Sequence, residues 1–424
     1  MILTFAVIIF AVLLVSGAPI FMAFAIGGLM IITLHTGLPL YNIGIFFFDS
    51  IDNWIMLAVP LFMFAGQLML ESGMGKILVD ALRSFIGRIP GSIAISAIVA
   101  SAFVGALAGQ NLAVLGSVGV VLFPSMMEAG YDKGYSGGVL CSSSQLGFLI
   151  PPSVVFIIYG FLTQTSVAKL FMAGIIPGII LSIMLIIAAI FIARKRRFPP
   201  MPELTRQERK FLLLRAIPSL LMPVIILGGI YGGVFTPTEA AAVACIYTLV
   251  VGIFIYRSLT WKRIWNSAIE SAQLTGIIMI LFCGVMLLGR AMTLIGLPQT
   301  IGEWVVSGGL TQNSFLLMLC IAFVILGMVM DAFAMVVVLP VVMPAVRLLG
   351  IDSIHLGVVF VVASMIGTMT PPASAAIYFT SSLFNIPTAE AIKGVLPFLA
   401  VMVLFLFILA FFPIISIWLP RMMF

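Results

Sequence analysis

Two stretches of this chain are versions of one another, and each position of the second equals the matching position of the first plus 220 (331 − 111 = 220). The first stretch carries Asn111, Pro124, Gly130, Asp132, Gly137, Ser144, Gly147 and Pro151-Pro152, and the second carries Asp331, Pro344, Gly350, Asp352, Gly357, Ser364, Gly367 and Pro371-Pro372. Duplicated segments that are interrupted by glycine and proline inside apolar sequence indicate a binding site between the repeats of a membrane transporter.

The composition requires a membrane environment. Hydrophobic residues make up 63% of the 424 residues and charged residues 8%, whereas a soluble domain has about 25% charged residues. Apolar runs such as 181–193 and 401–412 do not alternate with polar residues, as the strands of a membrane barrel would. We therefore predict an all-α polytopic membrane protein.

Several function classes are excluded by the absence of their motifs. The four cysteines form no CxxC pair, the two histidines lack partners at metal-binding spacing, and no hydrolase or nucleotide-binding motif is present. An enzyme is therefore not expected. The net charge of +6 is not organised as a basic domain, so no nucleic-acid partner is expected. The first apolar segment, 2–15, has no basic start or cleavage site and is interpreted as a retained helix.

One basic, proline-rich break at 194–211 divides the chain into two halves, 1–193 and 212–424. Each half contains one apolar segment that is too long for an ordinary span, 92–127 and 313–346. A single tilted helix and a re-entrant hairpin both fit this length. The glycines at 105 and 109 and the carboxylate of Asp331 fall in the middle of these segments, which favours two hairpins.

The hairpin interpretation also places most of the Lys and Arg residues on one side of the membrane. If the central basic break lies in the cytosol, only four of the 20 basic residues fall on or near the outer side: Lys169, Arg290, Arg347 and Arg421. A loop at 35–53, which carries Asp49 and Asp52 and no basic residue, then faces outward. The two halves become inverted repeats, each with one re-entrant hairpin and one broken helix, at about 137–163 and 357–384.

The broken helices suggest chemistry because proline lacks an amide donor, so the carbonyls upstream of each Pro-Pro pair lose their helical partners. Unpaired carbonyls at membrane depth are tolerated when they are buried or line a cavity, and a desolvated cation such as Na⁺ would satisfy them. The simpler alternative is a kink in a packed helix. Asp331 is costly within a membrane and marks an ion, proton or substrate route; the alternative is a structural partner for Arg290.

With these residues in view, the chain resembles the large membrane (M) subunit of TRAP transporters, the tripartite ATP-independent periplasmic family. The resemblance lies in the GGVFTPTEAAAV run at 232–243, in the run from Gly327 through Asp331 to Pro344, and in the sequence Gly367-Thr-Met-Thr-Pro-Pro372. It covers essentially the whole chain and implies a Na⁺-driven elevator-type importer in the bacterial inner membrane. It also implies two partners, a separate small four-helix Q subunit and a periplasmic binding protein that delivers an organic acid.

The resemblance also implies a set of site residues. One Na⁺ site would use Gly109, Gly147, Ile150 and Pro152, and the other Gly367, Thr368 and Thr370. The residues expected at the substrate cavity are Asn111, Ser144, Gln145 and Asp331. Sialic acids and C4-dicarboxylates both remain candidate substrates. A stand-alone divalent-anion/Na⁺ symporter is the alternative, and a channel or membrane scaffold without a coupled cycle is the third hypothesis.

Overall fold

The computed structural model describes residues 8–9, 12–13, 16–36, 41–85, 89–199, 205–372 and 374–423, and within these ranges it contains helices and no strand. The predicted segment 2–15 lies largely outside the described residues. The helices of the first half are α2 Ile20–Ile31, α3 Tyr41–Ile51, α4 Ala58–Glu71, α5 Met74–Arg83, α6 Ser92–Ala108, α7 Asn111–Val114, α8 Val120–Glu128, α9 Lys133–Ser144, α10 Leu146–Leu149, α11 Val154–Thr163 and α12 Val167–Arg196.

The second half continues with α13 Arg206–Tyr231, α14 Pro237–Val250, α15 Trp261–Leu294, α16 Leu297–Ser307, α17 Gln312–Gly327, α18 Ala332–Met335, α19 Leu339–Leu348, α20 Ser353–Thr368, α21 Ala375–Phe384, α22 Thr388–Phe411 and α23 Ile414–Met423. Short π-helical turns occur at η1 Ile32–Thr36, η2 Leu115–Gly119 and η3 Val251–Ile255, and a 3₁₀ turn at η4 Val336–Val338.

Six stretches of helix in the described part of the chain are long and apolar enough to cross a membrane: 111–128, 167–196, 206–231, 237–255, 261–294 and 388–411. A seventh span is obtained if the bent pair α9–α10 and α11, which meet at 41°, is one broken helix. The predicted all-α membrane fold is confirmed.

Both broken helices begin in the same way. A left-handed glycine, Gly130 (φ 79°) or Gly350 (φ 69°), turns the chain just before the helix starts. An aspartate then caps it: Asp132 accepts a hydrogen bond of 2.7 Å from the Tyr135 amide at the start of α9. At the start of α20, Asp352 accepts one of 2.8 Å from the amide two residues ahead. The helix regions predicted at 137–163 and 357–384 are each interrupted at their Pro-Pro pair, as expected.

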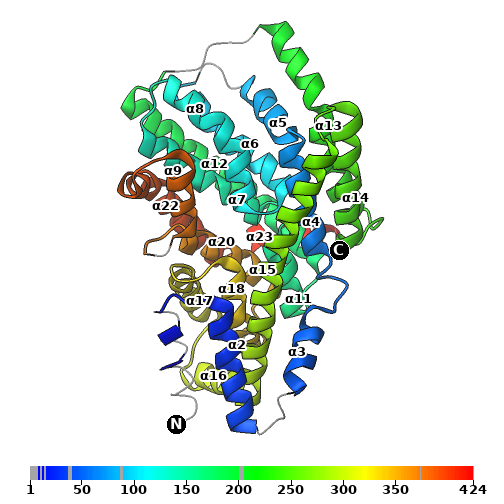
Figure 1. The fold of residues 1–424 in the computed structure, drawn as a ribbon. Helices are drawn as coiled ribbons and strands as arrows, with labels where there is room; N and C mark the ends of the chain where they lie inside the picture. The colour runs from blue at the N-terminus through cyan, green and yellow to red at the C-terminus, as the bar shows by residue number, and fades with distance from the viewer. Residues whose placement is uncertain are drawn as a thin grey trace.

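Both long segments double back as hairpins. In the first, α6 packs against α7, η2 and α8 after a turn at Gly109, which has a left-handed φ of 67°. In the second, α19 returns to pack against α16, the helix that precedes α17. Helices α16 and α17 lie in the lower part of the molecule, away from α5 and α8 at its top (Figure 1). The second leg of each hairpin is irregular at a matching place, a π turn at 115–119 and a 3₁₀ turn at 336–338. No residue pattern in the sequence predicts these irregular turns.

Two of the predicted non-helical segments are wrong. The segment 35–53 contains helix α3, which packs against α15 through its aromatic side, rather than one long loop. The break predicted at 194–211 is partly helical, because α12 continues to Arg196 and α13 begins at Arg206. The chain beyond α12 is held in place, since Phe198 stacks on Tyr131 with ring centroids 4.3 Å apart and Arg196 forms an ion pair with Asp132.

Helix packing separates two bundles that each draw on both halves of the sequence. The first, here called the frame bundle, contains α2, α3, α4, α13, α14 and α15. In it α15 contacts α2, α3 and α4, and α14 contacts α4 and α13. The second, the site bundle, contains α6–α12 and α17–α23, with α9 against α22 and α17 against α20. Helices α5 and α16 lie between the bundles, because α5 contacts both α13 and α6 while α16 contacts both α15 and α19.

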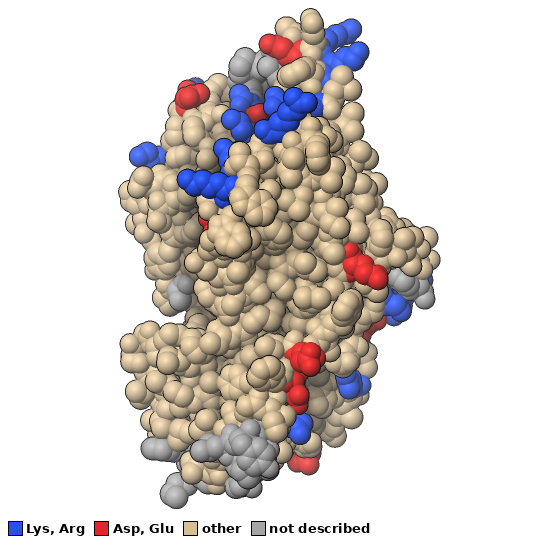
Figure 2. Space-filling model, turned by 45° about the vertical axis from the view of Figure 1, so that its right-hand side comes forward, with Lys and Arg blue, Asp and Glu red and all other residues tan. Residues whose placement is uncertain are grey.

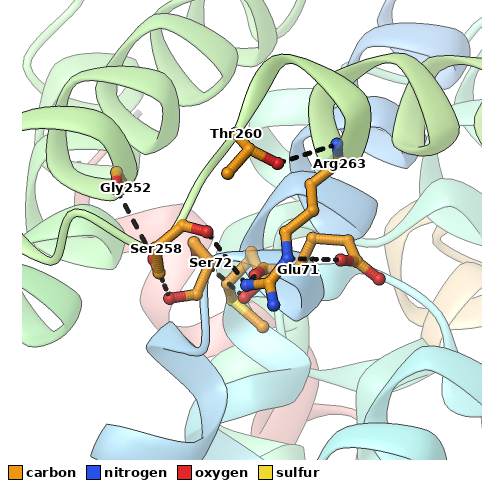
Figure 3. A network of polar contacts seen from close by, with 7 residues as sticks. Glu71, Ser72, Gly252, Ser258, Thr260 and Arg263 are labelled. Carbon is orange, nitrogen blue, oxygen red and sulfur yellow. Dashed lines mark hydrogen bonds and ion pairs between the residues drawn. The ribbon is translucent and has the colours of Figure 1, made fainter.

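A polar network fastens the frame bundle where α4 ends and α15 begins (Figure 3). Arg263 of α15 donates to the backbone oxygen of Ser258 at 2.9 Å and lies 3.8 Å from the Glu71 carboxylate at the end of α4. The Ser258 hydroxyl donates to the Ser72 carbonyl at 2.7 Å. These bonds satisfy carbonyls that the end of α4 leaves without helical partners. Figure 2 shows that Lys and Arg on the displayed face gather toward the end of the molecule where α12 leads to α13.

We expect Gly394→Ala to destabilise the site bundle. A Cβ at Gly394 of α22 would collide with the backbone carbonyl of Gly134 in α9, and a backbone atom cannot turn aside. Forced overpacking of this kind costs about 1–3 kcal/mol. Thermal unfolding in detergent would measure the loss. The matched control is Gly276→Ala in α15, where a Cβ meets nothing within 4 Å; equal melting temperatures for the two variants would contradict the close helix crossing.

Candidate ion and substrate site

Each broken helix lies directly on the first leg of its own hairpin, backbone against backbone. A Cβ at Gly105 of α6 would lie 2.9 Å from the Cα of Gly147, and a Cβ at Gly327 of α17 would lie 2.8 Å from the Cα of Gly367. Only glycine permits such an approach, which is how helices pack closely in membranes. The hairpin tips and the Pro-Pro breaks are thereby held side by side in both halves.

The first half-site brings the predicted backbone ligands together. A Cβ at Gly109 would lie 2.9 Å from the Pro152 carbonyl oxygen, and a Cβ at Gly147 would lie 3.0 Å from that of Gln110. No described residue donates a hydrogen bond to the carbonyls of Ile150 or Pro152. The Gly109 carbonyl accepts one bond of 3.2 Å, from Val154. Clustered carbonyl oxygens of this kind suit a hard cation.

The Gly147 carbonyl belongs to the same cluster for a reason visible in the sequence. The residue four positions ahead of Gly147 is Pro151, which has no amide hydrogen to complete the helical ladder. The break therefore leaves carbonyl oxygens, rather than amide donors, without helical partners beside the hairpin tip at Gln110.

The second half-site is arranged differently. The Gly367 carbonyl accepts a bond of 2.9 Å from the Thr370 amide, and the Thr370 hydroxyl donates to the Ile366 carbonyl at 2.7 Å. Thr368 is buried, and its hydroxyl has two acceptors within reach. Here local turns already bond the Gly367 carbonyl. A ligand at this half-site would therefore depend more on the hydroxyl oxygens of Thr368 and Thr370 than on backbone carbonyls.

The two half-sites meet at Gln145, a fully buried residue between α9 and α10. Its Oε1 accepts from Asn111 Nδ2 at 3.5 Å and from the Thr368 hydroxyl at 3.4 Å. The structure therefore places Asn111, Gln145 and Thr368 together. Ser144 is also buried in this region, but its hydroxyl donates back to the Cys141 carbonyl at 2.8 Å, as helix hydroxyls commonly do.

Asp331 lies at the tip of hairpin 2 with its side chain partly exposed. It occupies the position before α18, where the backbone amides of Ala332 and Phe333 at the start of that helix interact with its carboxylate. The described residues also contain no ion pair to its carboxylate. The alternative of a structural pair with Arg290 is not supported, because that guanidinium lies 5.8 Å from the ring centre of Phe46.

Three polar groups near the breaks were missed or not distinguished by sequence reasoning. The buried hydroxyls of Ser142 and Ser374 have no hydrogen-bond partner among the described residues, whereas Ser364 and Thr370 bond to their own helix. Gln110 is buried beside Asn111. A glutamine next to the tip glycine in an apolar run was the available signal for Gln110; which hydroxyl stays unpaired depends on side-chain geometry and has no signal in the sequence.

The paired hairpins, the broken helices and the backbone oxygens at their centre define a membrane transporter fold. Residues 7–415 match the family described as tripartite ATP-independent periplasmic transporter, DctM component, and the chain belongs to this family. It is accordingly a transporter subunit rather than an enzyme, and an integral protein of the inner membrane.

Named relatives cover most of the chain. It is 36% identical over 397 residues, 93% of each chain, to the C4-dicarboxylate TRAP transporter large permease protein DctM of Pseudomonas aeruginosa. It is 35% identical to the sialic acid TRAP transporter large permease protein SiaM of Vibrio cholerae, with 88% of each chain covered. The isethionate TRAP transporter permease protein DctMQ of Oleidesulfovibrio alaskensis is 33% identical over 95% of this chain, which spans 64% of that longer protein.

Solved structures show the same fold at low identity. The YdaH transporter of Alcanivorax borkumensis superposes with a TM-score of 0.61 at 14% identity, covering 89% of this chain and 90% of that one. MtrF of Neisseria gonorrhoeae superposes with a TM-score of 0.58, also at 14% identity, covering 91% and 85%. These similarities concern the fold alone.

We expect Asp331→Asn to impair transport without impairing folding. No ion pair of the described residues is lost with the charge, and the asparagine oxygen can still accept from the amides at the start of α18, so the free energy of unfolding should change by less than about 0.5 kcal/mol. Uptake should fall by about tenfold or more, which corresponds to about 1.4 kcal/mol. The control is Asp352→Asn, which removes a carboxylate at the start of α20. Uptake at the wild-type rate by the Asp331→Asn variant would show that Asp331 is not part of the site.

Proposed function

We propose that this chain is the large membrane subunit of a Na⁺-coupled importer of a small organic acid. The observation that carries the proposal is the cluster of backbone oxygens around Gly109 and Pro152, with a second cluster at Gly367–Thr370. Oxygens without donors inside an apolar bundle are satisfied by a desolvated cation. Na⁺ is the coupling ion implied by the family resemblance, and it enters this proposal as a transported ion.

The substrate belongs between the two half-sites. Asn111 and Asp331 supply amide and carboxylate groups there, with Gln145 bonded to Asn111 behind them, and hairpin tips present the amino ends of short helices such as α7 and α18. Amides and helix starts can receive a substrate carboxylate without a dedicated arginine. The names of the relatives, C4-dicarboxylate and sialic acid transporters, support an organic acid and leave these two substrate classes as the candidates.

The transport cycle in this proposal is an elevator movement. The site bundle carries both hairpins and both broken helices, whereas the frame bundle carries none of them. Movement of the site bundle along the frame bundle would carry ions and substrate across the membrane together, with α5 and α16 bending between the bundles.

Family membership implies two partners, a small Q membrane subunit and a periplasmic substrate-binding protein. The alternative function, a stand-alone divalent-anion/Na⁺ symporter, needs neither. Reconstitution in proteoliposomes separates the two proposals: uptake of succinate or a sialic acid only with Q and the binding protein supports the three-part importer, whereas full uptake by the chain alone supports the symporter. Ohmic currents without substrate-dependent flux would indicate a channel.

Replacing external Na⁺ by K⁺ should lower initial uptake by about tenfold or more in this reconstituted system, because the oxygen clusters would lack their cation. An inward Na⁺ gradient imposed without any other ion gradient should by itself accumulate the substrate. Equal uptake rates in the two salts would exclude Na⁺ coupling.

The elevator movement predicts that joining the bundles stops transport. A Cβ at Gly289 of α15 would lie 3.8 Å from the Cβ of Pro340 in α19, within the range of about 3.5–4.5 Å that a disulfide requires. Oxidation of a Gly289→Cys, Pro340→Cys variant should abolish uptake, and reduction should restore it. The control is Thr380→Cys beside native Cys141, where both residues belong to the site bundle. Undiminished uptake by the oxidised first pair would exclude a relative movement at this contact.

A further inference from the structure

Gln145 joins elements that come from opposite halves of the chain. Asn111 starts α7 at the tip of hairpin 1, and Thr368 ends α20 at the second break. Both donate to the same oxygen, Gln145 Oε1. Gln145 is fully buried, so water does not compete for these bonds. Its side chain is thus a direct physical connection between a proposed ion site and the expected substrate cavity.

Both hydrogen bonds to Gln145 are long and therefore weak. The Asn111 bond is 3.5 Å long and the Thr368 bond 3.4 Å, whereas such bonds are usually about 2.7–3.0 Å. The remaining anchor, from Gln145 Nε2 to the Cys141 carbonyl, is also long at 3.5 Å. None of these three contacts fixes the position of the Gln145 amide. A small strengthening of the bond from Thr368 would therefore move Gln145 Oε1 away from Asn111.

The bond from Thr368 is the one that a bound cation would strengthen. Its hydroxyl has a single proton and two acceptors, the Met365 carbonyl at 3.1 Å and Gln145 Oε1 at 3.4 Å. A cation held by the Thr368 oxygen polarises the O–H bond and makes it a stronger donor. The Met365 carbonyl belongs to helix α20 and cannot approach, but Gln145 Oε1 is carried on a flexible side chain and can.

We propose that Gln145 couples ion binding to substrate binding by exchanging these two bonds. A cation at Thr368 shortens the bond to Gln145 Oε1, and the same displacement breaks the bond from Asn111. The released Asn111 amide then donates to a carboxylate oxygen of the substrate. Gln145 is a positioning residue in this scheme, and the inference rests on the proposed function, because it takes Thr368 as a ligand of the transported cation.

The test is the ratio of substrate affinities with and without Na⁺. Binding of succinate and of N-acetylneuraminate to the purified transporter, with its Q subunit, is measured by calorimetry in Na⁺ and in K⁺ buffer. Gln145→Met keeps the volume and removes the polar atoms, so Asn111 is free in both buffers. The expected result is a tighter affinity in K⁺ and a ratio reduced by about fivefold or more, within the range of allosteric couplings.

A merely structural Gln145 gives a different result, since its loss would weaken binding by the same factor in both buffers and leave the ratio unchanged. That outcome overturns the proposal. The matched control is Ser143→Ala, which removes a neighbouring buried bond to Ser101 of 2.9 Å and should preserve the ratio. If Gln145→Met does not fold, Gln145→Ala removes the same two bonds and leaves the Thr368 hydroxyl in place as a ligand of the cation.

Failure of this inference can be told apart from failure of the proposed function by a second readout. Na⁺ should raise the melting temperature of the unmodified and the Gln145→Met proteins alike, without substrate, because the ion ligands are intact in both. A protein whose stability and substrate affinity are the same in Na⁺ and K⁺ overturns the proposed function. Na⁺ stabilisation together with an unchanged affinity ratio in Gln145→Met overturns only the coupling role.

Discussion

The close contact between each broken helix and its hairpin is the constraint on which the site depends. Gly105 against Gly147 and Gly327 against Gly367 leave no room for a side chain. Because the backbones touch, carbonyls near the break lie inside the bundle instead of against lipid, as that of Pro152 does beside Gly109. Without that contact, the same carbonyls would be unpaired groups in hydrocarbon, which costs several kcal/mol each. The glycine contacts thus keep the unpaired carbonyls of the break away from lipid and also determine the shape of the site.

The two half-sites use this common plan differently. Around Gly109 the carbonyls of Ile150 and Pro152 receive no donor from the described residues, whereas at Gly367 a local turn already supplies one. The first half adds the neutral Asn111 at its tip and the second adds the carboxylate of Asp331. The two halves therefore share one plan but carry different groups at their half-sites. Gln145 connects the two half-sites through its bonds to Asn111 and Thr368, and the matching position of the second half is Met365.

Much of the architecture was predictable because it depends on local rules. The 220-residue offset, the excess of apolar residues and the interrupted long segments led to the prediction of hairpins and broken helices. The structure confirms the all-α membrane fold, and both predicted broken helices are interrupted at their Pro-Pro pairs. The prediction was wrong for the segment 35–53, where Phe46 and its aromatic neighbours pack a helix against α15. It also missed the π turn at 115–119, because a bulge in a helix reflects packing rather than residue preference.

The sequence by itself determined that this protein is a helical membrane protein with a duplicated, proline-broken plan, since apolarity and the missing amide of proline act locally wherever the chain goes. It also determined which residues were candidates for the site. Only the tertiary structure decided that Gln145 lies between Asn111 and Thr368, that Asp331 forms no ion pair with a described residue, and that the packing bundles cut across the two halves of the chain. Those facts follow from which surfaces meet when helices far apart in sequence pack, and no local preference encodes that.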